Sequence, residues 1–158
     1  MCPYWTSQLL LLNSHCSYLD VSVLDISATA IDFTRQRLGA KAKDVSWYVG
    51  NVTQYDFGPK QFDLWHDRAV FHFLTERSDR QAYVELVRRS VKPGGHVLMA
   101  TFGPDGPLKC SGLDVVRYDD QSLHHEFGEG FQMLGSKLAE HNTPMGIRQQ
   151  FLYCWCRA

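Results

Sequence analysis

Side chains that could bind or activate a small molecule stand at or just beyond the ends of three apolar runs. The runs are VSVL, which begins at residue 21, VSWYV, which begins at residue 45, and FDLW, which begins at residue 62. The side chains are Asp25 and Ile26, Asn51 and Val52, and His66, Asp67 and Arg68. In open α/β sheets ligands bind beyond the carboxyl ends of the strands, so these seven positions are the first candidates for a site.

Asp25 offers the most specific chemistry among these positions. A carboxylate after the second strand of a nucleotide-binding unit can accept hydrogen bonds from both ribose hydroxyls at once, and such charge-assisted bonds are strong. The alternative interpretation is structural, because the helix macrodipole stabilises an acidic side chain at the start of a helix. The residues alone leave both interpretations of Asp25 open.

The elements that position these side chains alternate between strand and helix. Residues 21–25 are an expected strand, and Ser27 is suited to cap a helix that ends before Gly39. Residues 78–91 carry the apolar stripe of an amphipathic helix. Further strands are expected over residues 45–51, 61–67 and 96–102.

The last third of the chain adds a long connection and a hairpin. Residues 103–118 contain glycine and proline and exceed an ordinary connection in length. After a short helix expected over residues 120–127, two β-rich runs flank a turn at residues 142–146, which indicates an antiparallel hairpin. The pattern predicts an α/β fold with a mostly parallel sheet and one reversed strand.

Composition and charge narrow the classes of function. The 158 residues suit one domain, and a net charge of −1 with scattered basic residues makes neither nucleic acid nor a membrane an expected partner. The apolar run at residues 8–12 is too short to cross a bilayer and lacks the flanks of a signal peptide, which favours a cytoplasmic location. Five cysteines without a CxxC motif indicate neither a disulfide framework nor a metal site.

The ordered series of motifs resembles the class I S-adenosylmethionine-dependent methyltransferases. The series comprises VLDIS, WYVGNV, FDLWHDRAVFHFL and VKPGGHVLMATF, followed by the terminal hairpin. Within that superfamily, HDRAVFHFL looks like the branch in which an aspartate–arginine pair follows the fourth strand, as in thiopurine-type enzymes. The resemblance implies a Rossmann-like methyltransferase sheet, S-adenosylmethionine as the cofactor and a small molecule as the methyl acceptor.

The resemblance also implies which residues bind the cofactor. Asp25 would bind the ribose, and Ile26 would lie against the adenine face. Asn51, with Val52 beside it, stands where the family usually has an aspartate that accepts a hydrogen bond from the adenine amino group. An asparagine retains a carbonyl acceptor but loses the negative charge.

His66, Asp67 and Arg68 are the expected catalytic residues. By the same resemblance these residues line the acceptor pocket and the methionine end of the cofactor. His66 would also bind the cofactor. His66 or Asp67 would act as a general base for a weakly acidic acceptor. The alternatives are structural: a strand-end histidine with satisfied hydrogen bonds, and an Asp67–Arg68 pair near the surface that contributes little.

Residues 1–20 depart from the family pattern and form an atypical segment before a core of residues 21–158. The family opens with a strand and a glycine-rich turn of the form D-x-G-x-G, whereas Pro3 and Trp5 stand where glycines belong. Residues 8–13 are too close to residue 21 for a parallel crossover and are expected to form a helix.

The sequence therefore predicts a single methyltransferase-like domain over residues 1–158 that is truncated at its N-terminus. The expected function is S-adenosylmethionine-dependent transfer of a methyl group to a small-molecule acceptor. The alternative is a truncated, non-catalytic module that acts through protein–protein association, with a homodimer as a candidate assembly.

Overall fold

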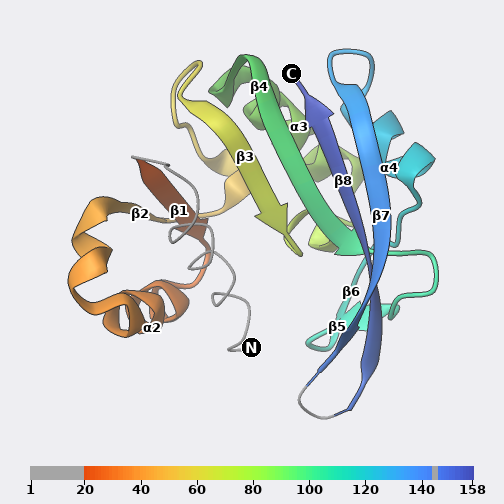
Figure 1. Cartoon of the computed structure of the whole chain (residues 1–158), viewed down its shortest axis with the longest axis horizontal. Helices are drawn as coiled ribbons and strands as arrows, with labels where there is room; N and C mark the ends of the chain where they lie inside the picture. The colour runs from red at the N-terminus through yellow and green to blue at the C-terminus, as the bar shows by residue number, and fades with distance from the viewer. Residues whose placement is uncertain (1–19, 144–145) are drawn as a thin grey trace. The chain divides into compact units, whose positions relative to one another are not determined.

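The computed structural model describes residues 20–143 and 146–158 (Figure 1). The chain divides into two compact units, Met1–Tyr55 and Asp56–Ala158. The single domain predicted over residues 1–158 stays a prediction. The expectations for residues 1–19, including the helix over residues 8–13, lie outside the described residues.

The described part of the first unit is a parallel pair of strands with one helix. The strands pair in register, so that Asp25 at the end of one lies opposite Val49 at the end of the other. Ser27 caps the helix as predicted, because its Oγ accepts a hydrogen bond from the Ala30 N–H at 3.2 Å. The elements are β1 (Val21–Asp25), α2 (Ala28–Leu38), η2 (Gly39–Asp44), β2 (Val45–Val49) and η3 (Val52–Gln54).

The second unit contains a four-stranded sheet in the order β3-β4-β8-β7. β3 and β4 are parallel, and β8 runs antiparallel to both of its neighbours, so β8 is the one reversed strand that the sequence predicts. The elements are β3 (Phe62–Arg68), η4 (Phe71–Phe73), α3 (Arg77–Ser90), β4 (Val91–Phe102), β5 (Lys109–Cys110), β6 (Leu113–Asp114), α4 (Asp120–Phe127), β7 (Gln132–Asn142) and β8 (Arg148–Arg157).

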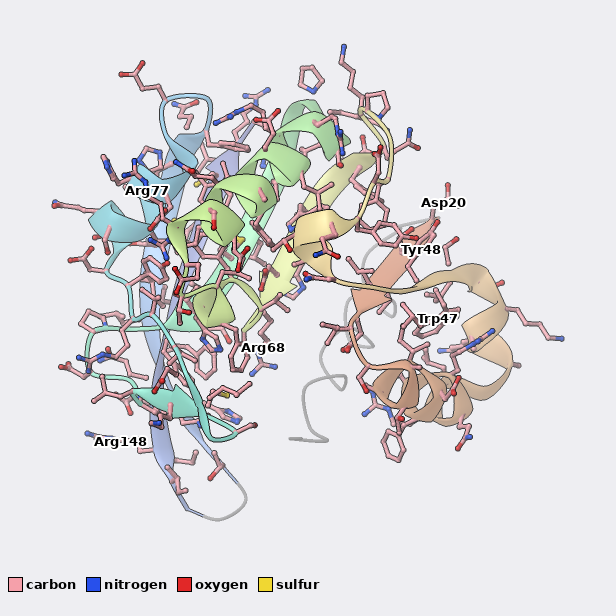
Figure 2. The ribbon with its side chains drawn as sticks, turned by 180° about the vertical axis from the view of Figure 1, so that it is seen from behind. Asp20, Trp47, Tyr48, Arg68, Arg77 and Arg148 are labelled. Carbon is pink, nitrogen blue, oxygen red and sulfur yellow. The ribbon has the colours of Figure 1, made fainter. Side chains whose placement is uncertain are left out.

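α3 and α4 cover the same face of this sheet (Figures 1 and 2). The hydroxyl of Tyr83 on α3 lies 3.7 Å from Met99 Sδ on β4, which identifies the covered face. Side chains alternate along a strand, so Val97 and Thr101 point to the same face as Met99, and all three are buried. This layer of helices and strands is the core of the second unit.

One feature of the fold differs from the sequence predictions. The connection over residues 103–118 contains a small antiparallel hairpin, β5–β6, whose two-residue strands are too short to show alternation in the sequence. The parallel pairing that the sequence predicts is present within each unit, between β1 and β2 and between β3 and β4. No helix within residues 20–143 and 146–158 is long and apolar enough to span a bilayer.

Candidate functional site

The carboxyl ends of β1 and β2 bring three predicted site residues to one edge of the first unit. The Gly50 N–H donates a hydrogen bond of 3.0 Å to the backbone oxygen of Asp25, which ties the two strand ends together just past their last register pair. A Cβ at Gly50 would lie 2.9 Å from the ring of Tyr55, so this close approach requires glycine. Asp25, Ile26 and Asn51 therefore share this edge.

Asp25 serves the start of α2 with one carboxylate oxygen. Its Oδ1 accepts a hydrogen bond from the Ser27 N–H at 2.7 Å. Its Oδ2 accepts no hydrogen bond from any residue that the structure describes, and the side chain is partly exposed. Both interpretations of Asp25 thus have a physical basis, because one oxygen is structural and the other can accept from a ligand.

Ile26 presents an apolar surface beside this carboxylate. The residue is 74 % exposed, which is unusual for a large aliphatic side chain next to a strand end. Val49, the register partner of Asp25, is 53 % exposed. Such surface beside a polar edge suits the face of a flat ring such as adenine.

Asn51 uses its side-chain oxygen within its own turn. Oδ1 accepts hydrogen bonds from the Thr53 N–H and the Thr53 hydroxyl, both at 3.0 Å, and so caps η3. The group left to face a ligand is the Nδ2 amide, which donates and does not accept. The acceptor role that the resemblance implies for Asn51 stays a prediction, and Val52 beside it is partly buried as the first residue of η3.

The three predicted catalytic residues do not share one face of β3. Asp67 points to the face that α3 and α4 cover, since its Oδ2 accepts a hydrogen bond from the Tyr83 hydroxyl at 2.5 Å. His66 and Arg68, its neighbours along the strand, project from the opposite face. The register of the strand therefore separates the carboxylate from the two basic side chains.

His66 is a neutral imidazole near pH 7. Burial lowers its pKa from the ordinary value of 6.5, and the positive charge of Arg68 lowers the pKa further. Its Nδ1 is buried and has no hydrogen-bond partner among the described residues, so the expectation of a satisfied strand-end histidine is not met at this atom. Arg68 ends β3 (Figure 2), and its guanidinium carbon lies 5.7 Å from the centre of the Phe151 ring on β8.

Asp67 belongs to a buried hydrogen-bond network. Its Oδ1 accepts from the Val70 N–H at 2.9 Å, and the Tyr83 hydroxyl that donates to Oδ2 accepts in turn from Trp65 Nε1 at 2.9 Å. Asp67 is only 5 % exposed, so the alternative of an Asp67–Arg68 pair near the surface is wrong. Burial raises the pKa of Asp67 to about 6, against the opposite effect of the hydrogen bonds from Tyr83 and the turn.

The sequence did not indicate that Tyr83 and the turn after β3 take part in the hydrogen-bond network of Asp67. The helical spacing placed Tyr83 on an apolar stripe, but no sequence signal paired its hydroxyl with Asp67. His72 lies buried in η4, in the same turn region. Burial lowers its pKa to about 4, and its Nδ1 accepts from the Phe102 N–H at 3.3 Å.

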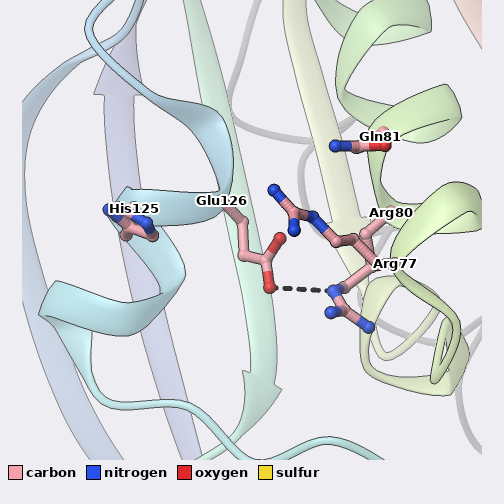
Figure 3. Close-up of a pocket in the computed structure, with 5 residues that line it drawn as sticks. All are labelled: Arg77, Arg80, Gln81, His125 and Glu126. Carbon is pink, nitrogen blue, oxygen red and sulfur yellow. Dashed lines mark hydrogen bonds and ion pairs between the residues drawn. The ribbon is translucent and has the colours of Figure 1, made fainter.

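Two of the hollows in the described part of the second unit contain no predicted site residue. One, of about 370 Å³, lies between α3 and α4, and Figure 3 shows the Arg80–Glu126 ion pair of 2.8 Å within it. The other, of about 520 Å³, is an open groove along residues 104–122. No group of three or more His, Cys, Asp or Glu side chains among the described residues could hold a metal ion.

The chain belongs to the methyltransferase domain family. The family model described as a methyltransferase domain matches residues 6–95, which is more than half of the chain. The match begins within residues 1–20, the segment expected to be atypical. None of the curated proteins matches the sequence significantly.

Solved structures of methyltransferases have the same fold. A methyltransferase from Methanosarcina mazei described as S-adenosylmethionine-dependent is 15 % identical, with a TM-score of 0.74 over 95 % of this chain and 85 % of its own. The N-methyltransferase NodS from Bradyrhizobium japonicum, in complex with S-adenosylhomocysteine, is 16 % identical, with a TM-score of 0.72 over 96 % of this chain and 72 % of its own.

A third solved structure, from Burkholderia thailandensis, is a 1,6-didemethyltoxoflavin-N1-methyltransferase with bound 1,6-didemethyltoxoflavin and S-adenosylhomocysteine. It is 16 % identical, with a TM-score of 0.72 over 99 % of this chain and 68 % of its own. The predicted methyltransferase class and the Rossmann-like α/β fold are confirmed. S-adenosylmethionine is the cofactor that these solved relatives support, and the acceptor, the site residues, the cytoplasmic location, the homodimer and the non-catalytic alternative stay predictions.

Proposed function

We propose that this chain transfers a methyl group from S-adenosylmethionine to a small-molecule acceptor, and that the edge formed by Asp25, Ile26 and Asn51 binds the adenosyl part of the cofactor. The observation that carries the proposal is the position of Asp25 at the end of β1, with Oδ1 held by Ser27 and Oδ2 left to accept. A ribose diol needs an acceptor of this kind.

The residues around Asp25 fit an adenosine. Ile26 offers an exposed apolar surface for one face of the adenine ring. The Asn51 Nδ2 group can donate to a ring nitrogen of adenine, because the Asn51 oxygen is already engaged by Thr53. A sugar acceptor, an apolar platform and an amide donor at one strand edge are the groups that a nucleoside requires.

The charge of the chain favours a small molecule as the acceptor. A net charge of −1 without a basic cluster gives no surface for the phosphates of nucleic acid. The solved relative from Burkholderia thailandensis has a small molecule, 1,6-didemethyltoxoflavin, bound together with S-adenosylhomocysteine. A small acceptor for this chain is consistent with both observations.

His66 is the group of this chain best suited to take a proton from the acceptor. S-adenosylmethionine supplies an activated methyl group on a sulfonium, so no nucleophile of the protein is needed. The lowered pKa of His66 leaves its imidazole unprotonated near pH 7 and able to accept a proton. Arg68, two residues further along the same face, adds a fixed positive charge that holds His66 in this neutral state.

Calorimetric titration with S-adenosylhomocysteine tests the cofactor site. In Asp25→Asn one side-chain oxygen can still accept from Ser27 while the charge is lost, so we expect affinity to fall about tenfold or more. Asp32→Asn, which changes an exposed acid on α2 of the same unit, should bind like the native chain. Native affinity in Asp25→Asn, or no binding to the native chain at millimolar ligand, would contradict the proposal.

Methyl-labelled cofactor tests the class of acceptor. After incubation of the protein with a cell extract, the label should appear in molecules that pass a membrane retaining macromolecules and that separate from the unreacted cofactor by chromatography. Asp25→Asn should transfer less label under the same conditions. Label that stays with protein or nucleic acid would refute the small-molecule acceptor and leave the cofactor site standing.

A further inference from the structure

The turn that follows β3 contains a residue in an unusual backbone conformation. Ala69 has φ +64°, in the left-handed region that residues with a Cβ adopt rarely. The residue is 7 % exposed, and its N–H donates a hydrogen bond of 2.7 Å to the Ala100 oxygen on β4. A buried alanine keeps such a conformation only where its surroundings enforce it.

Asp67 and Tyr83 hold the turn at Ala69 in this conformation from the covered face of the sheet. Asp67 Oδ1 accepts from the Val70 N–H at 2.9 Å and so closes the turn around Ala69. Asp67 Oδ2 accepts from the Tyr83 hydroxyl at 2.5 Å, which fixes the carboxylate to α3. Trp65 Nε1 donates to the Tyr83 oxygen at 2.9 Å and fixes the hydroxyl in its turn.

The same anchor sets the direction of the residue next to Asp67. Successive side chains on a strand point to opposite faces, so a carboxylate held against α3 directs Arg68 to the other face. Arg68 lies there 5.7 Å above the centre of the Phe151 ring, and its charge lowers the pKa of His66. Asp67 itself is buried and faces away from His66 and Arg68.

We propose that Asp67 and Tyr83 are positioning residues of the methyltransferase: their hydrogen bond holds the left-handed turn at Ala69, and this turn holds Arg68 beside His66 at the carboxyl end of β3. The inference rests on the proposed function, in which His66 at the carboxyl end of β3 takes a proton from the acceptor. The resemblance implies that Asp67 lines the acceptor pocket and acts as a general base. The proposal instead makes Asp67 a residue that positions Arg68. It also adds Tyr83, a residue of α3, to the machinery.

Tyr83→Phe tests the proposal, because it removes the hydroxyl and retains the ring. The exchange rate of the Val70 amide, measured by nuclear magnetic resonance, should rise about tenfold, which is the change that the loss of one hydrogen bond produces. The pKa of His66, followed from its ring protons, should rise because Arg68 is no longer held near it. Native values for both quantities would overturn the proposal.

Two further variants separate positioning from general stability. Tyr118→Phe is a matched control, because Tyr118 is also buried and its hydroxyl has no hydrogen-bond partner among the described residues. It should leave the Val70 amide and His66 unchanged. Ala69→Gly in the Tyr83→Phe background should restore both quantities, since glycine adopts this φ without strain. A double variant that behaves like Tyr83→Phe would contradict the role of the turn.

The outcome is distinguishable from that of the proposed function. If the native chain fails to bind S-adenosylhomocysteine while the Val70 and His66 responses appear, the proposed function fails and the positioning stands. If Tyr83→Phe does not fold, Asp67→Ala is measured in the same way, because it removes both carboxylate oxygens that bind Val70 and Tyr83. A folded Asp67→Ala with native Val70 exchange and a native His66 pKa would overturn the proposal.

Discussion

Replacing Asp67 by asparagine should change how the stability of the protein depends on pH. Burial raises the pKa of the Asp67 carboxyl from 3.8 to about 6, although hydrogen bonds from Tyr83, Val70 and Phe71 oppose the rise. A group whose pKa is higher in the folded chain than in the unfolded chain binds its proton more tightly when folded. Its stabilising contribution is therefore complete below pH 3.8 and is lost as the pH rises through about 6.

The size of the effect follows from these two pKa values. The gap between 3.8 and about 6, at about 1.4 kcal/mol per pH unit, corresponds to about 3 kcal/mol of unfolding free energy. The groups packed nearest the carboxyl are Tyr83 on α3, Trp65 on β3 and Met99 on β4, and none is charged in this range. The asparagine side chain of the variant does not titrate, so the variant avoids the loss.

Urea unfolding of the two proteins, followed by circular dichroism from about pH 4 to pH 7.5, measures this difference. The unfolding free energy of Asp67→Asn minus that of the native chain should increase with pH by up to about 3 kcal/mol. Other carboxylates titrate in both proteins and cancel in the difference. Asp63→Asn is the control, because it removes an exposed carboxylate on the same strand, and its difference should change by less than about 1 kcal/mol. If the difference for Asp67→Asn is flat or falls with pH, the raised pKa of the buried Asp67 carboxyl is refuted.

Two further predictions concern the predicted site residues. Asn51→Asp should bind S-adenosylhomocysteine about tenfold more weakly in calorimetry, because one oxygen still caps Thr53 while the amide that donates to the adenine ring nitrogen is replaced by a carboxylate oxygen. Gln54→Glu, which adds the same charge nearby, should not have this effect, and equal affinities would refute the reasoning. Arg68→Gln should raise the pKa of His66 in a nuclear magnetic resonance titration, since the charge of Arg68 lowers it. An unchanged midpoint would show that the two side chains do not interact.

Much of the secondary structure could be predicted from local chemistry. Ser27 caps α2, and the helix ends at Gly39 where φ is +57°. The bounds of β1 and α4 match the predictions because each is closed by a residue whose local preference is strong. The position of Asp25 at a strand end follows from the same kind of information.

The directions of polar side chains at the strand ends could not be predicted in this way. Asn51 turns its oxygen toward Thr53 because the start of η3 offers a backbone N–H at 3.0 Å. Asp67 turns its carboxylate toward Tyr83, sixteen residues away in sequence, because α3 packs against that face of the sheet. Tyr83 stands outside the run of letters around Asp67, whereas Thr53 follows Asn51 by two residues and only the start of η3 shows that the Asn51 oxygen turns toward it.

The sequence by itself determined the class of this protein: its ordered motifs, apolar runs and caps define an α/β methyltransferase fold with candidate groups after each strand. Only the tertiary structure decided which candidates lie together and what each one does. It placed Asp25, Ile26 and Asn51 on one edge, and it assigned Asp67 to the core while His66 and Arg68 face the other way. The physical reason is that local propensities fix where an element begins and ends, whereas the packing of a helix on a sheet fixes the burial, the hydrogen-bond partners and the pKa of each side chain.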